Sequence, residues 1–163
     1  MTTNSLQNRS SSAFQLIVAL AAMIAFWIAG PAQAGDNVVE YATAASGYDV
    51  VAYHTEGKAK VGSTDNFTYH NGKAYLFSSK KNKEMFMKNP SKYEPAFNGF
   101  CAMGVAMGKK LPVDPKAFKI VDGVLYLNLN KDVQKFWMDD MATNIDTANE
   151  KWSGIKHKNP ADL

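Results

Sequence analysis

The sequence predicts a small α+β domain built of two β-hairpin-plus-helix units with additional short helices. Two dipeptides carry this prediction, Asn71-Gly72 and Asp122-Gly123. Both favour the positive backbone angles of a two-residue hairpin turn, and strand-forming residues flank each of them. The third observation is a faint internal repeat with a displacement of 51 residues. It aligns Phe67 with Phe118, Gly72 with Gly123, Tyr75 with Tyr126, Leu76 with Leu127 and Lys80 with Lys131. These identities fit either a duplication or the shared local preferences of two hairpins.

A helix is expected after each hairpin. Ser79 is predicted to cap the first helix, which turns Met85 and Phe86 inward and ends at Asn89-Pro90. Asn130 is predicted to cap the second. Apolar residues then recur at helical spacing, namely Val133, Phe136, Trp137, Met141, Ile145, Ala148 and Trp152. The polar run Ala142-Thr143-Asn144 is the place where this stretch would divide into two helices.

The first 34 residues have the pattern of a secretory signal peptide. An apolar run at 14–30 follows a short polar segment with Arg9, and Ala32-Gln33-Ala34 suits signal peptidase. We expect cleavage after Ala34 and a periplasmic protein of a Gram-negative cell. The alternative is an uncleaved membrane anchor, since a run of this length lies at the lower limit for spanning a bilayer.

The composition of the remaining chain, 35–163, bounds its function. Its length fits one domain with one core. Seventeen lysines stand against fifteen acidic residues, interspersed along the sequence, and a net charge of +2 does not indicate a nucleic-acid partner. After Arg9 there is no arginine, so the forked donors that hold phosphate at two points are absent. Cys101 is the only cysteine, so no internal disulfide forms.

The stretch from Tyr69-His70-Asn71-Gly72 through Phe77-Ser78-Ser79 to Asn89-Pro90-Ser91-Lys92-Tyr93 resembles the YHS domain. Gly47-Tyr48-Asp49 is similar to the opening motif of exported members, in which Asp49 would cap a short helix. The resemblance implies a core module at about 47–93 and a C-terminal extension at 94–163. It extends into that part through Asn98-Gly99-Phe100-Cys101-Ala102 and the segment around Asp122-Gly123.

The same resemblance implies a metal site, such as a copper site, built on cysteines. Ala52, Ser78 and Asn82 stand where those cysteines would be. Hydroxyl and amide groups are poor partners for copper or zinc, which prefer thiolate, thioether and imidazole ligands. We therefore expect that the usual metal site of the family is missing from this chain.

A replacement site is predicted from Cys101 with His54 and His70. Cys101 follows a plausible helix start at Asn98-Gly99, where oriented backbone groups favour a thiolate. A buried, inert cysteine is the alternative, since free cysteine is among the most buried residue types. Both histidines also have structural explanations, because His70 adjoins a tight turn and His54 replaces one planar ring with another. His157, in the lysine-rich tail, is expected to be solvated.

Met103 and Met107 lie four residues apart and could present two thioethers to copper(I). With Phe100 they also form an ordinary apolar stripe, so we expect them to be buried. No nucleophile elbow, phosphate loop or paired-histidine metal helix is present in the sequence. The sequence therefore predicts a non-enzymatic binding protein for a metal ion such as copper or for a small ligand. The competing hypothesis is an accessory protein that contacts an exported or membrane protein.

Overall fold

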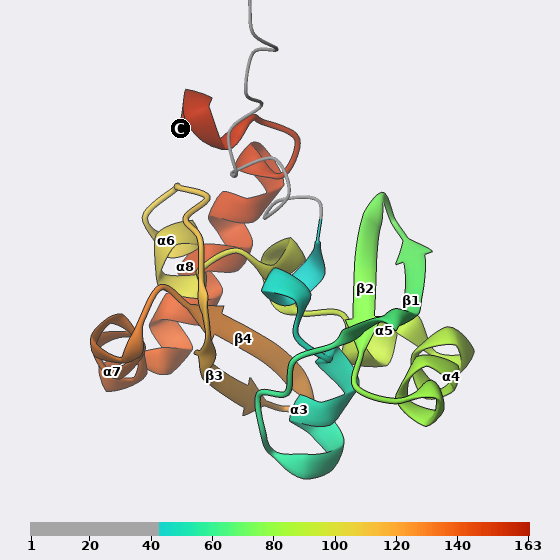
Figure 1. Cartoon of the computed structure of the whole chain (residues 1–163). Helices are drawn as coiled ribbons and strands as arrows, with labels where there is room; N and C mark the ends of the chain where they lie inside the picture. The colour runs from blue at the N-terminus through green and yellow to red at the C-terminus, as the bar shows by residue number, and fades with distance from the viewer. Residues whose placement is uncertain (1–42) are drawn as a thin grey trace, which may run out of the picture. The chain divides into compact units, whose positions relative to one another are not determined.

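The computed structural model describes residues 43–163, which belong to one compact unit. It confirms the predicted α+β fold with two antiparallel hairpins, each followed by helices (Figure 1). The predicted signal peptide, its cleavage site after Ala34 and the start of the processed chain at Gly35 lie outside the described residues.

The elements fall into two consecutive sets with the same order. The N-terminal repeat contains η2 (Ala44–Gly47), α3 (Val50–Glu56), β1 (Ser63–His70), β2 (Lys73–Phe77), α4 (Lys80–Lys88) and α5 (Pro90–Tyr93). The C-terminal repeat contains η3 (Ala96–Gly99), α6 (Ala102–Ala106), β3 (Asp114–Val121), β4 (Val124–Asn128), α7 (Lys131–Asp139) and α8 (Met141–Ile155). A short 3-10 helix, η4 (Pro160–Asp162), follows α8.

The two hairpins have the same turn and the same register. Asn71 and Gly72 have φ values of 48° and 76°, and Asp122 and Gly123 have values of 50° and 79°. Phe67 pairs with Leu76 in the first hairpin as Phe118 pairs with Leu127 in the second. An irregularity in the pairing lies between Ser63 and Phe67 and again between Asp114 and Phe118. The repeat that the sequence indicates faintly is therefore a repeat of backbone structure.

The repeat also includes the segments before the hairpins, which the sequence comparison did not align. Ala45, Ser46 and Gly47 form a left-handed turn with φ values of 49°, 50° and 80°. Phe97, Asn98 and Gly99 form the same turn with values of 55°, 55° and 82°. Each turn adjoins a single parallel bridge to the following hairpin, Thr43 to Ala74 and Pro95 to Leu125.

The predicted helix caps are confirmed. The side chain of Ser79 accepts a hydrogen bond from Asn82 N at 3.2 Å, and that of Asn130 accepts one from Val133 N at 2.8 Å. Asp49 caps α3 by accepting from Val51 N at 2.9 Å and Ala52 N at 3.2 Å. These side chains supply acceptors to helix N–H groups that have no partner inside the helix.

The long apolar stretch divides earlier than predicted. Asp140, with φ of −139° and ψ of 62°, separates α7 from α8, so the predicted break at Ala142-Thr143-Asn144 is wrong. Asp140 leaves the helical region, and residues 142–144 continue α8. Phe86 and Trp137 face the core as expected, whereas Phe136 is 62% exposed.

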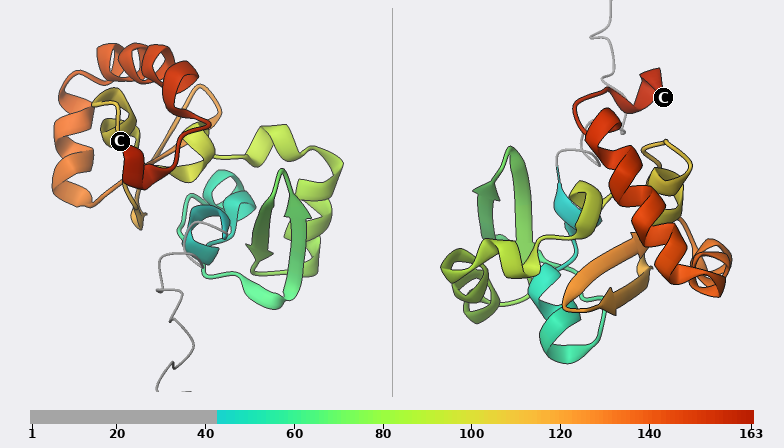
Figure 2. Two further views of the ribbon diagram at one scale, coloured as in Figure 1. Left: turned by 90° about the horizontal axis from the view of Figure 1, so that it is seen from above. Right: turned by 180° about the vertical axis from the view of Figure 1, so that it is seen from behind.

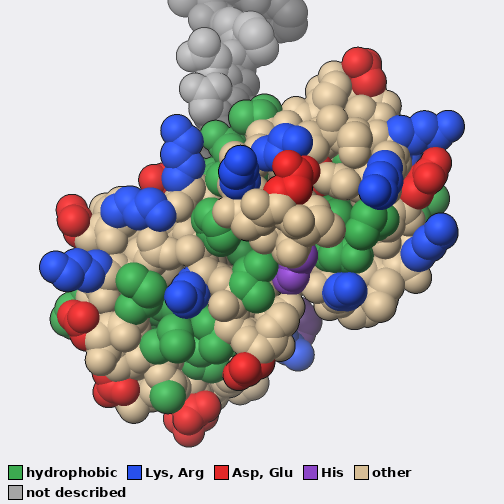
Figure 3. Space-filling model, turned by 90° about the horizontal axis from the view of Figure 1, so that it is seen from below, with side chains coloured by type: hydrophobic (Ala, Val, Ile, Leu, Met, Phe, Trp, Pro, Cys, Tyr) green, Lys and Arg blue, Asp and Glu red, His purple; other side chains and the backbone are tan. Residues whose placement is uncertain are grey.

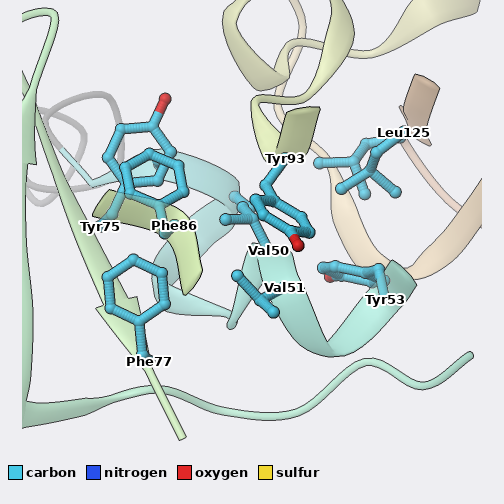
Figure 4. Packing of buried hydrophobic residues seen from close by; sticks show 11 residues of the cluster. Val50, Val51, Tyr53, Tyr75, Phe77, Phe86, Tyr93 and Leu125 are labelled. Atoms are coloured by element: carbon cyan, nitrogen blue, oxygen red, sulfur yellow. The ribbon is translucent and has the colours of Figure 1, made fainter. Parts of the chain in front are cut away.

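Two hydrophobic clusters form the interior of the described residues. The first joins both repeats, because Leu125 and Leu127 of β4 pack with the apolar residues of α3, β2 and α4 (Figure 4). Tyr53 adds a hydrogen bond between the repeats, because its hydroxyl donates to Pro115 O at 2.9 Å. The second cluster surrounds Trp137 and includes Phe97, Tyr126, Ala148 and Ile155.

The helix α8 lies alongside α6 (Figure 2), and a buried lysine holds its end in place. Lys110 Nζ donates to Lys156 O at 2.9 Å and to Lys158 O at 2.6 Å. It also faces the rings of Phe100 and Trp152. Burial lowers the pKa of Lys110, while the two carbonyls supply acceptors that favour the charged ammonium.

We predict that Gly72→Val and Gly123→Val each lower the free energy of unfolding by about 1–3 kcal/mol. A Cβ at either position has open space around it, so the cost comes from forcing a β-branched residue to a positive φ. Chemical denaturation measures the change. Gly154→Ala is the control, and its effect should have the opposite sign, because Gly154 lies in α8 and a Cβ added there has open space around it. It should raise stability by about 0.5–1 kcal/mol. Unchanged stability in both valine variants would contradict the assignment of the turns.

Candidate functional site

Each repeat contains a junction where three elements meet. The residue that caps the short helix lies beside the end of the second strand and the first turn of the next helix. In the N-terminal repeat this cap residue is Asp49, whose side chain is fully buried. Its Oδ2 accepts hydrogen bonds from Ser78 N at 2.8 Å, Ser78 Oγ at 2.7 Å and Asn82 Nδ2 at 2.7 Å.

The residues at this junction include the positions where the family resemblance places metal-binding cysteines. Ala52 N, Ser78 and Asn82 all donate hydrogen bonds to Asp49. A buried carboxylate is tolerated only when it is well paired and hydrogen-bonded, and here five donors satisfy it. The N-terminal junction is therefore a closed polar cluster in which serine and asparagine serve as donors to Asp49.

Cys101 takes the place of Asp49 in the C-terminal repeat. Its backbone N–H donates to Leu111 O at 3.1 Å, as the N–H of Asp49 donates to Lys60 O at 2.8 Å. Its Sγ accepts from Gly104 N and from Leu129 N, both at 3.3 Å. Cys101 is thus the N-cap of α6 and, like Asp49, binds the N–H that follows the second strand.

Asn128 completes this junction and was not predicted from the sequence. It is fully buried at the end of β4, and its Oδ1 accepts from Met103 N at 3.4 Å. The same oxygen lies 3.8 Å from Cys101 Sγ, where the thiol is the donor. Asn128 Nδ2 is buried and has no hydrogen-bond partner among the described residues.

The thiol of Cys101 has no exposed surface. Burial raises its pKa, and hydrogen bonds from the backbone of Gly104, Leu129 and Met103 oppose this shift without reversing it. Cys101 is therefore a neutral thiol near pH 7. The predicted bias toward thiolate is wrong because desolvation outweighs the oriented N–H groups.

An apolar pocket of about 430 Å³ opens at the C-terminal junction. It is lined by Cys101, Met103, Gly104, Met107, Leu111, Leu129, Asp132, Val133 and Phe136. Gly104, Leu129 and Val133 occupy the positions that Ala52, Ser78 and Asn82 occupy in the other repeat. Because leucine and valine side chains cannot donate hydrogen bonds to the cap residue, this junction has no polar cluster corresponding to the one around Asp49.

The rim of the pocket carries two exposed apolar residues. Met107 and Phe136 are each 62% exposed, so the predicted burial of Met107 in a stripe is wrong. The reason is that Met107 ends α6 as its C-cap residue and has passed beyond the face that packs on the core. Met103, Met107 and Cys101 place three sulfur-bearing side chains along one pocket.

The structure does not bring His54 and His70 to Cys101. His54 lies in α3, where its ring packs edge-on against Tyr93 at 5.4 Å, and neither histidine lines the pocket. Burial and the nearby Lys92 lower the pKa of His54. His70 ends β1 with its Nε2 3.4 Å from Glu94 Oε1. Among the described residues, no three His, Cys, Asp or Glu side chains form a group that could hold a metal ion.

Most pocket residues escaped prediction because they come from two stretches, 101–111 and 129–136, which the hairpin of β3 and β4 separates in sequence. Leu111, Leu129 and Val133 are ordinary apolar residues with no motif to mark them. A signal was available in the repeat, since a displacement of 51 aligns Val133 with Asn82 and Leu129 with Ser78. It could be interpreted only once the structure showed that Ser78 and Asn82 both contact Asp49.

Comparisons of the chain with protein-family models, with curated proteins and with solved structures give no match. The resemblance to the YHS domain therefore stays a hypothesis that depends on the residues quoted above. Within residues 43–163, none of the helices has the length and apolar character needed to cross a membrane.

We predict that Cys101→Ser changes the free energy of unfolding less than Cys101→Ala does. A serine oxygen can still accept from Gly104 N and Leu129 N, whereas alanine leaves both without this acceptor. Loss of a cap of this kind costs about 1–2 kcal/mol. Thermal or chemical denaturation of both variants measures the order.

An inert core cysteine would give the opposite order, because a serine hydroxyl in an apolar site without partners costs more than a methyl group. Alkylation of the native thiol is the independent check. A buried neutral thiol should react with iodoacetamide at the rate at which the protein opens. Labelling as fast as that of a free thiol would contradict the assigned burial.

Proposed function

We propose that this chain is a non-enzymatic binding protein whose ligand occupies the apolar pocket of the C-terminal repeat. The ligand class that fits best is a small, uncharged, apolar molecule. The observation that carries the proposal is the difference between two equivalent junctions. One is closed by polar side chains around Asp49, and the other is an open pocket of about 430 Å³.

The volume and lining of the pocket support a small organic ligand. Pockets that hold such ligands are commonly about 300–1,000 Å³ and lined mainly by apolar side chains. Eight of the nine lining residues here are apolar or glycine, and Asp132 supplies the one carboxylate. Unbranched Met103 and Met107 are suited to such a lining, because methionine adapts its shape to irregular partners.

The proposal includes that the chain is an exported protein related to the YHS domain. The convergence of Ala52, Ser78 and Asn82 around Asp49 supports the alignment with the family, since the family's ligands would have to meet at one place. A periplasmic binding protein without an enzymatic activity is the function that we infer from this combination.

Copper(I) is the second candidate ligand, and a specific observation favours it. Cys101, Met103 and Met107 line one pocket, and thiolate and thioether groups are the ligands that copper(I) prefers. This set differs from the predicted set of Cys101, His54 and His70. A copper ion would have to displace the proton of a fully buried thiol, which makes an organic ligand the first candidate.

A protein partner is the third candidate that has to be distinguished from an organic ligand and from copper(I). Met107 and Phe136 would then contact an apolar side chain of an exported or membrane protein instead of covering a small molecule. Pull-down of a partner that competes with a small apolar probe for the pocket would favour this alternative.

We predict saturable binding of the apolar dye N-phenyl-1-naphthylamine to the purified protein, measured as an increase in dye fluorescence. Phe136→Glu and Met107→Glu should each weaken binding at least about tenfold, because each brings a charge to an apolar site. Both residues are exposed, so their thermal midpoints should change little.

Met138→Glu is the matched control, because Met138 is an exposed residue of α7 that does not line the pocket. Its dye affinity should equal that of the parent. Absence of saturable binding, or equal weakening in the control, would refute the proposed pocket function.

The copper(I) candidate predicts that Met107→Leu lowers copper(I) affinity measured against a competing chelator. Leucine keeps the apolar volume but removes the thioether. Met87→Leu is the control, since Met87 is 58% exposed and lies in the other repeat. If the parent protein and both variants hold copper(I) equally weakly against the chelator, copper(I) is eliminated as a ligand. The small organic molecule then remains the candidate.

A further inference from the structure

The solvent-facing side of α4 gathers positive charge that the sequence had shown only as scattered lysines. At 100° per residue, Lys80, Lys81, Lys83 and Lys88 lie within an arc of about 160°. Glu84, the single acidic residue of α4, is exposed within the same arc, so the positive charges on this side exceed the negative ones by three. No ion pair involves these four lysines among the described residues. The side of the molecule that carries α4, at the right in Figure 3, shows lysines around hydrophobic side chains.

Exposed apolar side chains lie among these lysines. Met87 projects from the same arc of α4 and is 58% exposed. On the neighbouring strand β1, Phe67 lies under Lys83, with the Nζ atom 5.9 Å from the ring centre. Tyr69, which is 73% exposed, packs edge-on against Phe67 at 5.6 Å. We call this combined surface of α4 and β1 the α4 face.

The equivalent surface of the C-terminal repeat has a different charge. Residues 80–93 carry five lysines and one acidic residue, a net charge of +4. Residues 131–155 carry three lysines and five acidic residues, a net charge of −2. Because the two repeats share one backbone plan, this difference belongs to the side chains and not to the fold.

We propose that the α4 face binds the surface of a bilayer that contains anionic phospholipids. The lysines would lie at the level of the phosphate groups, and Met87, Phe67 and Tyr69 would enter the interface between headgroups and acyl chains. Basic residues attract a protein to anionic lipid, and adjacent apolar and aromatic side chains supply the buried area that holds it there.

Other anionic partners fit this surface less well. Nucleic acid is a weaker candidate because the face has no arginine, and arginine is the preferred residue for forked phosphate contacts. A second copy could offer its acidic α7 and α8, but that region has a net charge of only −2 over twenty-five residues. A bilayer interface accounts for the lysines together with the exposed Met87 and Tyr69, because it offers anionic headgroups next to an apolar layer.

The test is co-sedimentation with vesicles. It uses the chain from Gly35 onward, which contains both hydrophobic clusters. Vesicles of phosphatidylcholine with phosphatidylglycerol are compared with vesicles of phosphatidylcholine alone. We expect partition onto the anionic vesicles only, and loss of binding in about 0.5 M salt because screening shortens the reach of charge. The triple variant Lys80→Gln, Lys81→Gln, Lys88→Gln should partition roughly a hundredfold more weakly, at about five-fold for each lysine.

The matched control is the triple variant Lys135→Gln, Lys151→Gln, Lys156→Gln, which removes the same charge from exposed side chains of the C-terminal repeat. It should retain most of the parent's partition. Equal losses in both triple variants would overturn the proposal by showing that only net charge matters. Binding to DNA but not to anionic vesicles, or self-association at low salt in place of vesicle binding, would also overturn it.

The apolar part of the face is tested separately with Tyr69→Ser and Met87→Ser. Each should weaken partition onto anionic vesicles several-fold, while Met138→Ser on α7 should not. If both serine variants bind like the parent, insertion of these side chains is refuted. The dye-binding pocket lies in the other repeat, so failure of the membrane proposal leaves the dye result unchanged.

Discussion

The fold depends on one hydrogen bond that each repeat makes between its hairpin and its short helix. The N–H of the residue that follows the second strand donates to the side chain of the helix cap, from Ser78 to Asp49 and from Leu129 to Cys101. The bond holds the strand end against the first turn of α3 or α6. It also determines where the next helix begins, because Ser79 and Asn130 cap α4 and α7 one residue later.

Two acceptors of different strength perform this role, and the difference has consequences. A buried carboxylate requires several donors, so Asp49 has Ser78 and Asn82 around it and the N-terminal junction is closed. A thiol is a weak acceptor and tolerates apolar neighbours, so Leu129 and Val133 could replace those donors. An open apolar pocket lowers stability relative to a filled one, and native proteins retain such features chiefly where function uses them.

The sequence predicted what depends on neighbouring residues. Asn71-Gly72, Asp122-Gly123, Ser79 and Asn130 each act within three residues of their own position, so turns and caps followed from local chemistry. The pocket depends on contacts between segments ten to thirty residues apart, which a single sequence does not record. The sequence also contains no sign that Asp49 and Cys101 are equivalent, because a carboxylate and a thiol are chemically unlike. Only the structure shows that the two side chains occupy the same position in their repeats and accept equivalent backbone hydrogen bonds. Cys101 therefore looked like a metal ligand beside two histidines, and the structure shows it as a helix cap.

The two repeats show how one backbone plan can carry two different surfaces. The two repeats differ both in the junction around the cap residue and in the charge of the exposed helix face. The N-terminal repeat combines a closed junction with a basic α4 face, and the C-terminal repeat combines an open junction with an acidic pair of helices. The shared first hydrophobic cluster, which takes Leu125 and Leu127 from β4 into the N-terminal repeat, keeps the two sets of side chains in one structure. A ligand in the pocket and a membrane at the α4 face would then contact different repeats, so either could bind without displacing the other.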